Sequence, residues 1–260
     1  MSEVDFARLL RARHLRGTPY GSEHLCMLLY ALARRERPRR VVELGTGLGA
    51  TTVWLAAALL ENGDGRLWSF DDNSHLDQIG RAQLDGFADE LELERGLDML
   101  GFAVSLLDRC GVAAPASFVE QRIDLGEAAA GRVDWAFGVE PIDWVFSDIR
   151  HGPEAIEQLL AAFLPLASPT LGLFIDSAST KTTSFLVAER LVDQLNRNKL
   201  PAAWTVFDEE WRERLTRVVA QREFALTHLV ERRNQPQNST MWITAQPVGW
   251  RPYPATMMRN

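Results

Sequence analysis

Five acidic residues and one histidine follow short apolar segments of this 260-residue chain, at places where side chains can do chemistry. The segments have the β-branched and aromatic composition of buried strands, and helical patterns alternate with them, so we expect a parallel sheet. Because parallel strands end at one edge, these side chains should line one cleft. Carboxylates there can hold ribose hydroxyls, amino groups or a metal ion, and a histidine can accept a proton. The residues are Glu43, Asp71, Asp124, Asp148, Asp176 and His151.

A glycine-rich turn precedes the most apolar helical pattern of the chain. Residues 41–52 read VVELGTGLGATT, which combines a buried strand, a tight turn and a helix start. Three glycines at alternate positions permit positive φ and close approach of a ligand. The free N–H groups at the start of the helix attract an anionic group, so the turn is typical of a nucleotide-type cofactor site. The candidate cofactor contacts in it are Gly45, Thr46, Gly47, Gly49 and Thr51.

The residue two positions before the first glycine helps to choose the cofactor. Gly45, Gly47 and Ala50 also fit the dinucleotide pattern G-x-G-x-x-[GA], but Glu43 stands where such a turn keeps an apolar residue. A carboxylate can accept hydrogen bonds from an amino group, while the helix N-terminus takes a carboxylate. An amino acid attached to a nucleoside meets both demands. The stretch resembles motif I (E-x-G-x-G-x-G) of the class I S-adenosylmethionine-dependent methyltransferases, which implies S-adenosylmethionine as cofactor and Glu43 as a cofactor-binding residue.

Composition narrows the functional classes. The chain is 46% hydrophobic and 24% charged, as in a globular protein, and its net charge of −7 disfavours a nucleic-acid partner. Cys26 and Cys110 lack a metal-type spacing and are expected to be buried thiols. The charged N-terminus is unlike a signal peptide, and no apolar run reaches the length of a membrane span. These features favour a cytoplasmic protein with no membrane partner.

The order of the patterns predicts the organisation of the chain. Helical patterns at 3–16 and 23–33 predict an N-terminal helical cap at 1–36. We expect a S-adenosylmethionine-binding methyltransferase domain at 37–250 and a C-terminal tail at 251–260. The fold class is α/β, a Rossmann-like, doubly wound and mostly parallel sheet. The resemblance implies seven strands with an antiparallel last strand, which a final strand pair at 224–230 and 240–245 fits.

Two further segments have more than one interpretation. The helical insertion at about 74–95 follows the second strand and either covers the cofactor, forms an oligomer contact such as that of a homodimer, or is a plain surface helix. The arginines at 34, 35, 37, 39 and 40 are most simply a solvated helix end, with an acidic partner as the alternative.

Acids at two strand ends are expected to hold the nucleoside. Asp71 ends the second strand about twenty residues past the glycines, at the usual place of the residue that binds ribose hydroxyls. Asp72 is the neighbour that could replace it. By the resemblance, the acid after the third strand faces the adenine amino group, which makes Asp124 a cofactor-binding candidate.

The fourth and fifth strand ends suggest the reaction. The segments DWVFSDIRH and FIDSAS resemble two branches of the methyltransferases, one with the pattern D-G-x-H and one of the catechol and caffeoyl O-methyltransferase type. Asp148 and His151 match the first, although Ile149 replaces its glycine. In the second, Asp148 and Asp176 match magnesium ligands, although Ser177 replaces an asparagine, and His151 occupies the place of a lysine base. The resemblance thus implies Mg²⁺ held by two acids; alternatively Asp148 lines the cofactor pocket and His151 caps a helix.

The chemistry expected from these residues is O-methylation of a small hydroxylated acceptor. His151, Asp148 and Asp176 are its catalytic candidates, with His151 as base. A non-catalytic S-adenosylmethionine-binding or scaffold protein and a NAD-dependent oxidoreductase are the alternatives. The acceptor wall is expected from 1–22, 74–95 and 200–215, where core packing explains the aromatic residues equally well. Those aromatic residues are Trp204, Phe207 and Trp211.

Overall fold

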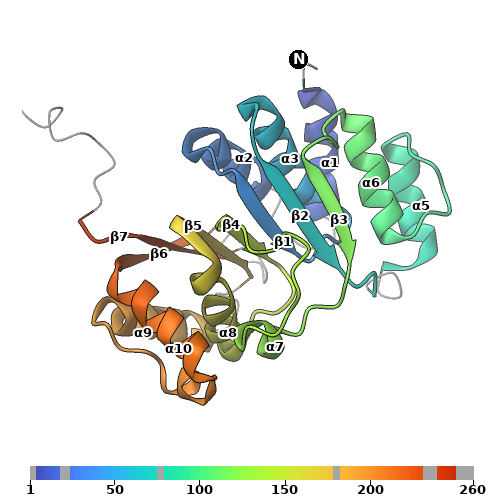
Figure 1. The fold of residues 1–260 in the computed structure, drawn as a ribbon. Helices are drawn as coiled ribbons and strands as arrows, with labels where there is room; N and C mark the ends of the chain where they lie inside the picture. Colours follow the sequence, from blue (N-terminus) through green and yellow to red (C-terminus); the bar gives the residue numbers. More distant parts are fainter. Residues whose placement is uncertain (1–3, 18–23, 75–78, 178–181, 231–238, 250–260) are drawn as a thin grey trace, which may run out of the picture.

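The computed structural model describes residues 4–17, 24–74, 79–177, 182–230 and 239–249. Helices cover both faces of one seven-stranded sheet (Figure 1). In chain order the elements are α1 (Phe6–Gly17), α2 (Leu25–Glu36), β1 (Arg40–Leu44), α3 (Ala50–Asn62), β2 (Arg66–Asp71), α5 (Arg81–Glu90), α6 (Met99–Cys110), β3 (Ala116–Glu120), α7 (Leu125–Ala129), β4 (Ile142–Ser147), α8 (Pro153–Phe163), η1 (Leu164–Leu166), β5 (Ala167–Asp176), α9 (Thr182–Asn196), η2 (Ala202–Val206), α10 (Glu209–Ala220), β6 (Arg222–Val230) and β7 (Ser239–Pro247).

The strand order is β3-β2-β1-β4-β5-β7-β6, with β1 to β5 parallel and β7 antiparallel to both of its neighbours. The expected Rossmann-like fold class, including the antiparallel last strand, is therefore confirmed. The chain leaves β1 in one direction toward β2 and β3, then returns to place β4 on the other side of β1. Loops after β1 and β4 diverge at this switch point, which opens a crevice beyond the carboxyl ends of the strands.

Two apolar layers fill the space between the sheet and its helices. One contains residues of α1, α2, α3, α5 and α6, and the other contains residues of α7, α8, α9 and α10. Figure 1 shows these two groups of helices on opposite sides of the sheet. Side chains of β1 alternate between them, since Val41 lies in the first layer and Val42 in the second. Both cysteines are buried free thiols, as the sequence predicts. No helix in the described ranges is long and apolar enough to cross a membrane.

Helix α3 lies between glycines of the same backbone conformation. Gly49 precedes it and Gly63 follows it, each with φ +75°. A Cβ on Gly49 would lie 2.8 Å from the Cβ of Ala103 in α6, whereas a Cβ on Gly63 would meet nothing within 4 Å. Gly49 is therefore required by helix packing, and the close approach it permits is to α6.

Replacing these glycines by alanine separates the cost of a side chain at positive φ from the cost of a clash between α3 and α6. Both variants acquire a side chain at positive φ, but only Gly49→Ala must also push α3 and α6 apart. We expect Gly49→Ala to lower the free energy of unfolding by about 1–3 kcal/mol more than Gly63→Ala, the usual cost of overpacking. Urea unfolding followed by circular dichroism measures both, and equal losses would contradict the packing argument.

The structure corrects the expected acceptor wall at 200–215. Trp204 and Trp211 belong to the apolar core that α7 to α10 form with the sheet, and Phe207 packs against the same core. The Trp211 ring lies so close to Gly131 that a Cβ there would stand 2.8 Å from it. These aromatic residues therefore fill the core and do not line the cleft, which is the alternative that core packing offered.

Candidate active site

A cavity of about 620 Å³ lies at the carboxyl ends of β1 to β5. It contains the turn after β1, the ends of β2 and β5, and the segments that follow β3 and β4. Three residues of the insertion, Ser74, Ile79 and Gln83, also line it, so part of the insertion forms the cavity wall. The lining residues are Gly45, Thr46, Gly47, Leu48, Ala50, Thr51, Phe70, Asp71, Asp72, Ser74, Ile79, Gln83, Gln121, Arg122, Ile123, Asp148, Ile149, Arg150, His151, Asp176 and Ser177.

The glycine turn is fixed to both neighbouring strands. The Gly45 N–H donates to the Phe70 carbonyl at 2.8 Å, and a Cβ on Gly45 would lie 3.2 Å from the Asp148 carbonyl carbon. Gly45 and Gly47 have φ values of +92° and +52°, which glycine adopts at little cost. The turn therefore runs between the ends of β2 and β4 and presents backbone to the cavity.

Asp71 joins the end of β2 to this turn. Its carboxylate accepts the Gly47 N–H at 2.9 Å on one oxygen and the Asn73 N–H at 2.7 Å on the other. The side chain is buried yet lines the cavity, whereas Asp72 is exposed and accepts the Ser74 N–H at 3.1 Å. Each carboxylate oxygen has a second lone pair, so Asp71 can still accept from a hydroxyl of a bound ligand.

Glu43 lies beneath the turn rather than in the cavity wall. Its buried carboxylate accepts the hydroxyls of Thr52 at 2.6 Å and Ser69 at 2.5 Å. Ser69 and Thr46 hydroxyls lie 2.6 Å apart, and since Ser69 gives its hydrogen to Glu43, Thr46 donates to Ser69. This chain of hydroxyls fixes Thr46 within the turn. The sequence did not suggest Thr52 or Ser69, because both look like ordinary helix and strand residues.

The carboxylate of Asp124 caps α7 instead of lining the cavity. It accepts the N–H groups of Glu127 at 3.1 Å and Gly126 at 2.8 Å, and these backbone donors lower the pKa of Asp124. The cavity wall after β3 consists of Gln121, Arg122 and Ile123, which precede it. An adenine ring in this part of the cavity would therefore meet Gln121 and Ile123 before it met Asp124.

Asp148 and His151 lie close together in the loop after β4. The Asp148 N–H donates to the Leu44 carbonyl at 2.8 Å, which holds this loop beside the glycine turn. The His151 Nε2 lies 3.8 Å from Asp148 Oδ1, and both side chains are partly buried and line the cavity. The Ser184 hydroxyl of α9 donates to the His151 carbonyl at 2.7 Å. The loop is thus tied at both ends, and the imidazole has a fixed carboxylate neighbour.

The structure does not support the magnesium site expected at Asp148 and Asp176. Asp176 is 1% exposed, and its carboxylate accepts the hydroxyls of Thr240 at 2.9 Å and Ser177 at 3.3 Å. Within the described ranges, no group of three or more His, Cys, Asp or Glu side chains is arranged to hold a metal ion. Mg²⁺ requires several oxygen ligands in near-octahedral geometry. The donors present do not fit the predicted metal site, so we assign no chemical step to a metal.

The fold and this cavity define a class of enzyme: the parallel sheet with its antiparallel seventh strand, the glycine turn and the acid after β2 are those of the class I S-adenosylmethionine-dependent methyltransferases. Comparison with known families agrees. A methyltransferase domain family matches residues 42–178, more than half of the chain, and the chain belongs to this family. No curated protein matches the sequence.

Solved structures share the fold at low sequence identity. An O-methyltransferase from Bacillus cereus, in complex with SAH, is 15% identical, with 95% of this chain and 93% of that chain covered and a TM-score of 0.51. The O-methyltransferase TomG from Streptomyces achromogenes, in complex with SAM, is 20% identical, with 95% and 91% covered and a TM-score of 0.49. At these identities the likeness concerns the fold alone.

Proposed function

We propose that this protein methylates a hydroxyl group of a small acceptor with S-adenosylmethionine. The observation that carries the proposal is that one cavity joins the glycine turn and Asp71 to the pair formed by Asp148 and His151. A cofactor site and a base therefore share one space. Membership of the methyltransferase family supports the cofactor, and the Bacillus cereus structure with this fold is that of an O-methyltransferase in complex with SAH.

The turn after β1 and the end of β2 would hold the cofactor. Backbone of Gly45 and Gly47 faces the cavity, and the start of α3 offers N–H groups to the cofactor carboxylate. Asp71, and to a lesser extent Asp72, would accept the ribose hydroxyls. When bound, S-adenosylmethionine supplies a sulfonium methyl group, which passes to the acceptor oxygen while the bonding electron pair stays on sulfur.

His151 would take the proton of the acceptor hydroxyl. Its Nε2 lies 3.8 Å from Asp148, so a positive charge on the imidazole would be stabilised by that carboxylate. Both side chains are partly buried, so water screens the two charges less than it would at the surface, which strengthens this attraction. Asp176 also lines this cavity. Its carboxylate is held by hydrogen bonds from the hydroxyls of Thr240 and Ser177, and we place it at the end of the cavity that would receive the acceptor.

A direct assay tests the proposal. The purified chain should bind S-adenosylmethionine in calorimetry, bind NAD⁺ far more weakly, and form methylated product from a panel of phenols, catechols and aliphatic alcohols. Gly47→Val is the binding-deficient control: its branched side chain in the cavity wall should displace the cofactor and abolish both binding and methylation. Selective NAD⁺ binding would overturn the proposal, and tight cofactor binding without any methylation would support the alternative of a non-catalytic binding protein.

The domain division remains part of this proposal: a helical cap at 1–36, a methyltransferase domain at 37–250 and a tail at 251–260. Leu9 of α1 and Leu29 of α2 are buried in the same apolar layer as α3, which is consistent with a cap that packs on the domain.

A further inference from the structure

A second cavity, of about 600 Å³, lies at the amino ends of β1 and β2, opposite the cofactor end of the sheet. Part of the arginine-rich segment 34–40 lines it. Arg37 donates to the Asn62 carbonyl at 2.7 Å and so behaves as the end of α2, but Arg40 begins β1, Arg39 directly precedes it, and both line this cavity. The lining residues are Arg39, Arg40, Asp64, Gly65, Arg66, Trp68, Ala136, Phe137 and Glu140.

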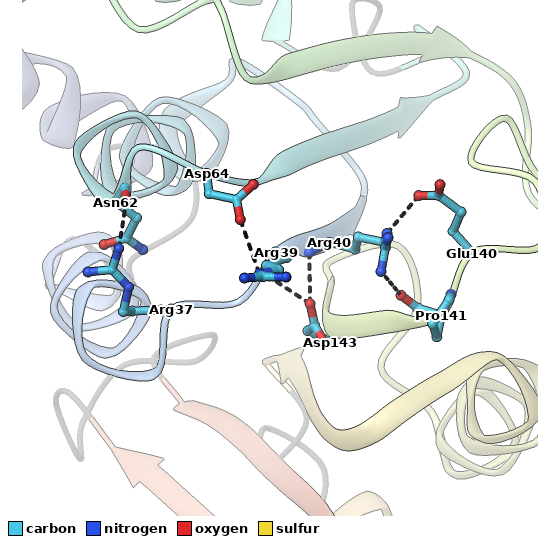
Figure 2. A network of polar contacts seen from close by, with 8 residues as sticks. All are labelled: Arg37, Arg39, Arg40, Asn62, Asp64, Glu140, Pro141 and Asp143. Carbon is cyan, nitrogen blue, oxygen red and sulfur yellow. Dashed lines mark hydrogen bonds and ion pairs between the residues drawn. The ribbon is translucent and has the colours of Figure 1, made fainter. Parts of the chain in front are cut away.

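Two arginines of this cavity are direct neighbours. Arg40 and Arg66 are register partners on the parallel strands β1 and β2, so both side chains emerge on the same face. Like charges on directly opposite residues of a sheet are destabilising unless an anion lies between or beside them. Arg40 has such a partner, since its Nε lies 2.6 Å from Glu140 (Figure 2). The Arg66 guanidinium forms no hydrogen bond or ion pair within the described ranges.

The backbone that carries these arginines is firmly held. A single oxygen of Asp143 accepts the N–H groups of Arg39 and Arg40 at 2.8 and 2.9 Å (Figure 2). The Arg66 N–H donates to the Arg39 carbonyl at 2.7 Å. Arg39 itself pairs with Asp64 at 3.1 Å, where both side chains are exposed. The acids therefore neutralise Arg39 and Arg40, and the positive charge of Arg66 is left over.

Aromatic side chains form the inner wall beside this charge. Trp68 lies two residues after Arg66 in β2, hence on the same face, and its ring centroid is 5.8 Å from that of Phe137 in an edge-to-face contact. Both residues also line the cavity. A ligand that reaches this wall would combine an anionic group at the arginines with an apolar or planar group at the rings.

We propose that this cavity binds a phosphate monoester. The phosphate group would lie between Arg40 and Arg66, whose planar forks match phosphate oxygens, and one of its negative charges would balance the charge of Arg66 that Glu140 and Asp64 leave over. Because Trp68 and Phe137 line the cavity beside the arginines, the proposed ligand carries an organic group that contacts these rings. This site is separate from the cofactor cavity and does not depend on the proposed methyl transfer.

Titration calorimetry with phenyl phosphate and inorganic phosphate tests the site. Wild-type protein should bind phenyl phosphate more tightly than inorganic phosphate, and saturation with S-adenosylhomocysteine should not change either affinity. Arg66→Gln should weaken phenyl phosphate binding about tenfold or more, the scale for losing one charge-assisted hydrogen-bonded contact. Arg190→Gln, which removes the same charge from an exposed position on α9, should leave the affinity unchanged.

A third variant should act in the opposite direction. Glu140→Gln removes the acid that neutralises Arg40, so phenyl phosphate should bind about threefold or more tightly, in line with the energy of a surface ion pair. Three results would overturn the proposal: equal loss in Arg66→Gln and Arg190→Gln, weaker binding in Glu140→Gln, or displacement of phenyl phosphate by S-adenosylhomocysteine. Phenyl phosphate that binds no more tightly than inorganic phosphate would likewise exclude the aromatic contact.

Discussion

Replacing His151 by alanine should lower kcat by a factor of about 10²–10⁴, the usual contribution of a general base. The cofactor affinity should change little, because the residues proposed to hold the cofactor belong to the turn after β1 and the end of β2. Initial rates at saturating cofactor and acceptor, together with calorimetric titration of S-adenosylmethionine, measure both quantities. Turnover that stays normal in His151→Ala would show that the imidazole does not accept the proton.

The dependence of kcat on pH adds a readout that a structural role would not affect. A base must be neutral to accept a proton, so the wild-type rate should fall as pH drops and the imidazole becomes charged. This acidic fall should disappear in His151→Gln, which keeps a hydrogen-bonding side chain but cannot titrate. Asp148→Asn should give a smaller loss, since it removes only the carboxylate 3.8 Å from Nε2. EDTA should leave the wild-type rate unchanged, in agreement with a donor set that does not fit a metal.

The fold could be predicted from the sequence because its signals are local and repeat along the chain. Each buried strand is a short apolar run, and the glycine turn at 41–52 marks where β1 ends and α3 begins. The apolar runs do not mark every boundary: β5 starts at Ala167, four residues before the apolar run LGLFI at 171–175. Those first residues are partly exposed and polar, so they lack the hydrophobic signal of a strand even though they extend it.

The direction of each acidic side chain could not be predicted in the same way. Glu43 and Asp124 were both expected to contact the cofactor; neither lines the cavity, and the carboxylate of each accepts hydrogen bonds from other parts of the protein. Asp124 has backbone donors two and three residues away, whereas the donors to Glu43 come from Thr52 in α3 and Ser69 in β2. A buried carboxylate takes whichever donors are nearest in space, and these are set by packing between elements.

The sequence also could not decide which residues form the walls of the cavity. Ile79 and Gln83 of the insertion line it, and this arrangement was one of three that the sequence left open. Trp204 and Trp211 were candidates for the acceptor wall, but they lie in the core. A tryptophan has the same apolar signal in a core and in a cavity wall. Only the packing of α10 and η2 against the sheet decides which of the two positions it takes.

Replacing Asp71 by alanine should have the largest effect on cofactor binding. The proposed ribose contact would be lost, and so would the hydrogen bond from the Gly47 N–H, which holds the glycine turn in place. We expect a loss of about 1–3 kcal/mol, the scale for charge-assisted hydrogen bonds, or roughly a 5- to 150-fold rise in the Kd for S-adenosylmethionine. Titration calorimetry measures this Kd, and thermal unfolding without ligand shows how far the variant is destabilised.

Asp72→Ala is the matched control, because it removes the same group one residue further along the chain. Its carboxylate is exposed and bonds to Ser74 in its own loop, so we expect a rise in Kd well below that of Asp71→Ala. Asp71→Asn should fall between the two, since the amide oxygen can still accept one N–H but carries no charge. If Asp72→Ala weakens binding more than Asp71→Ala, the ribose contact is made by Asp72, and Asp71 serves only to hold the glycine turn.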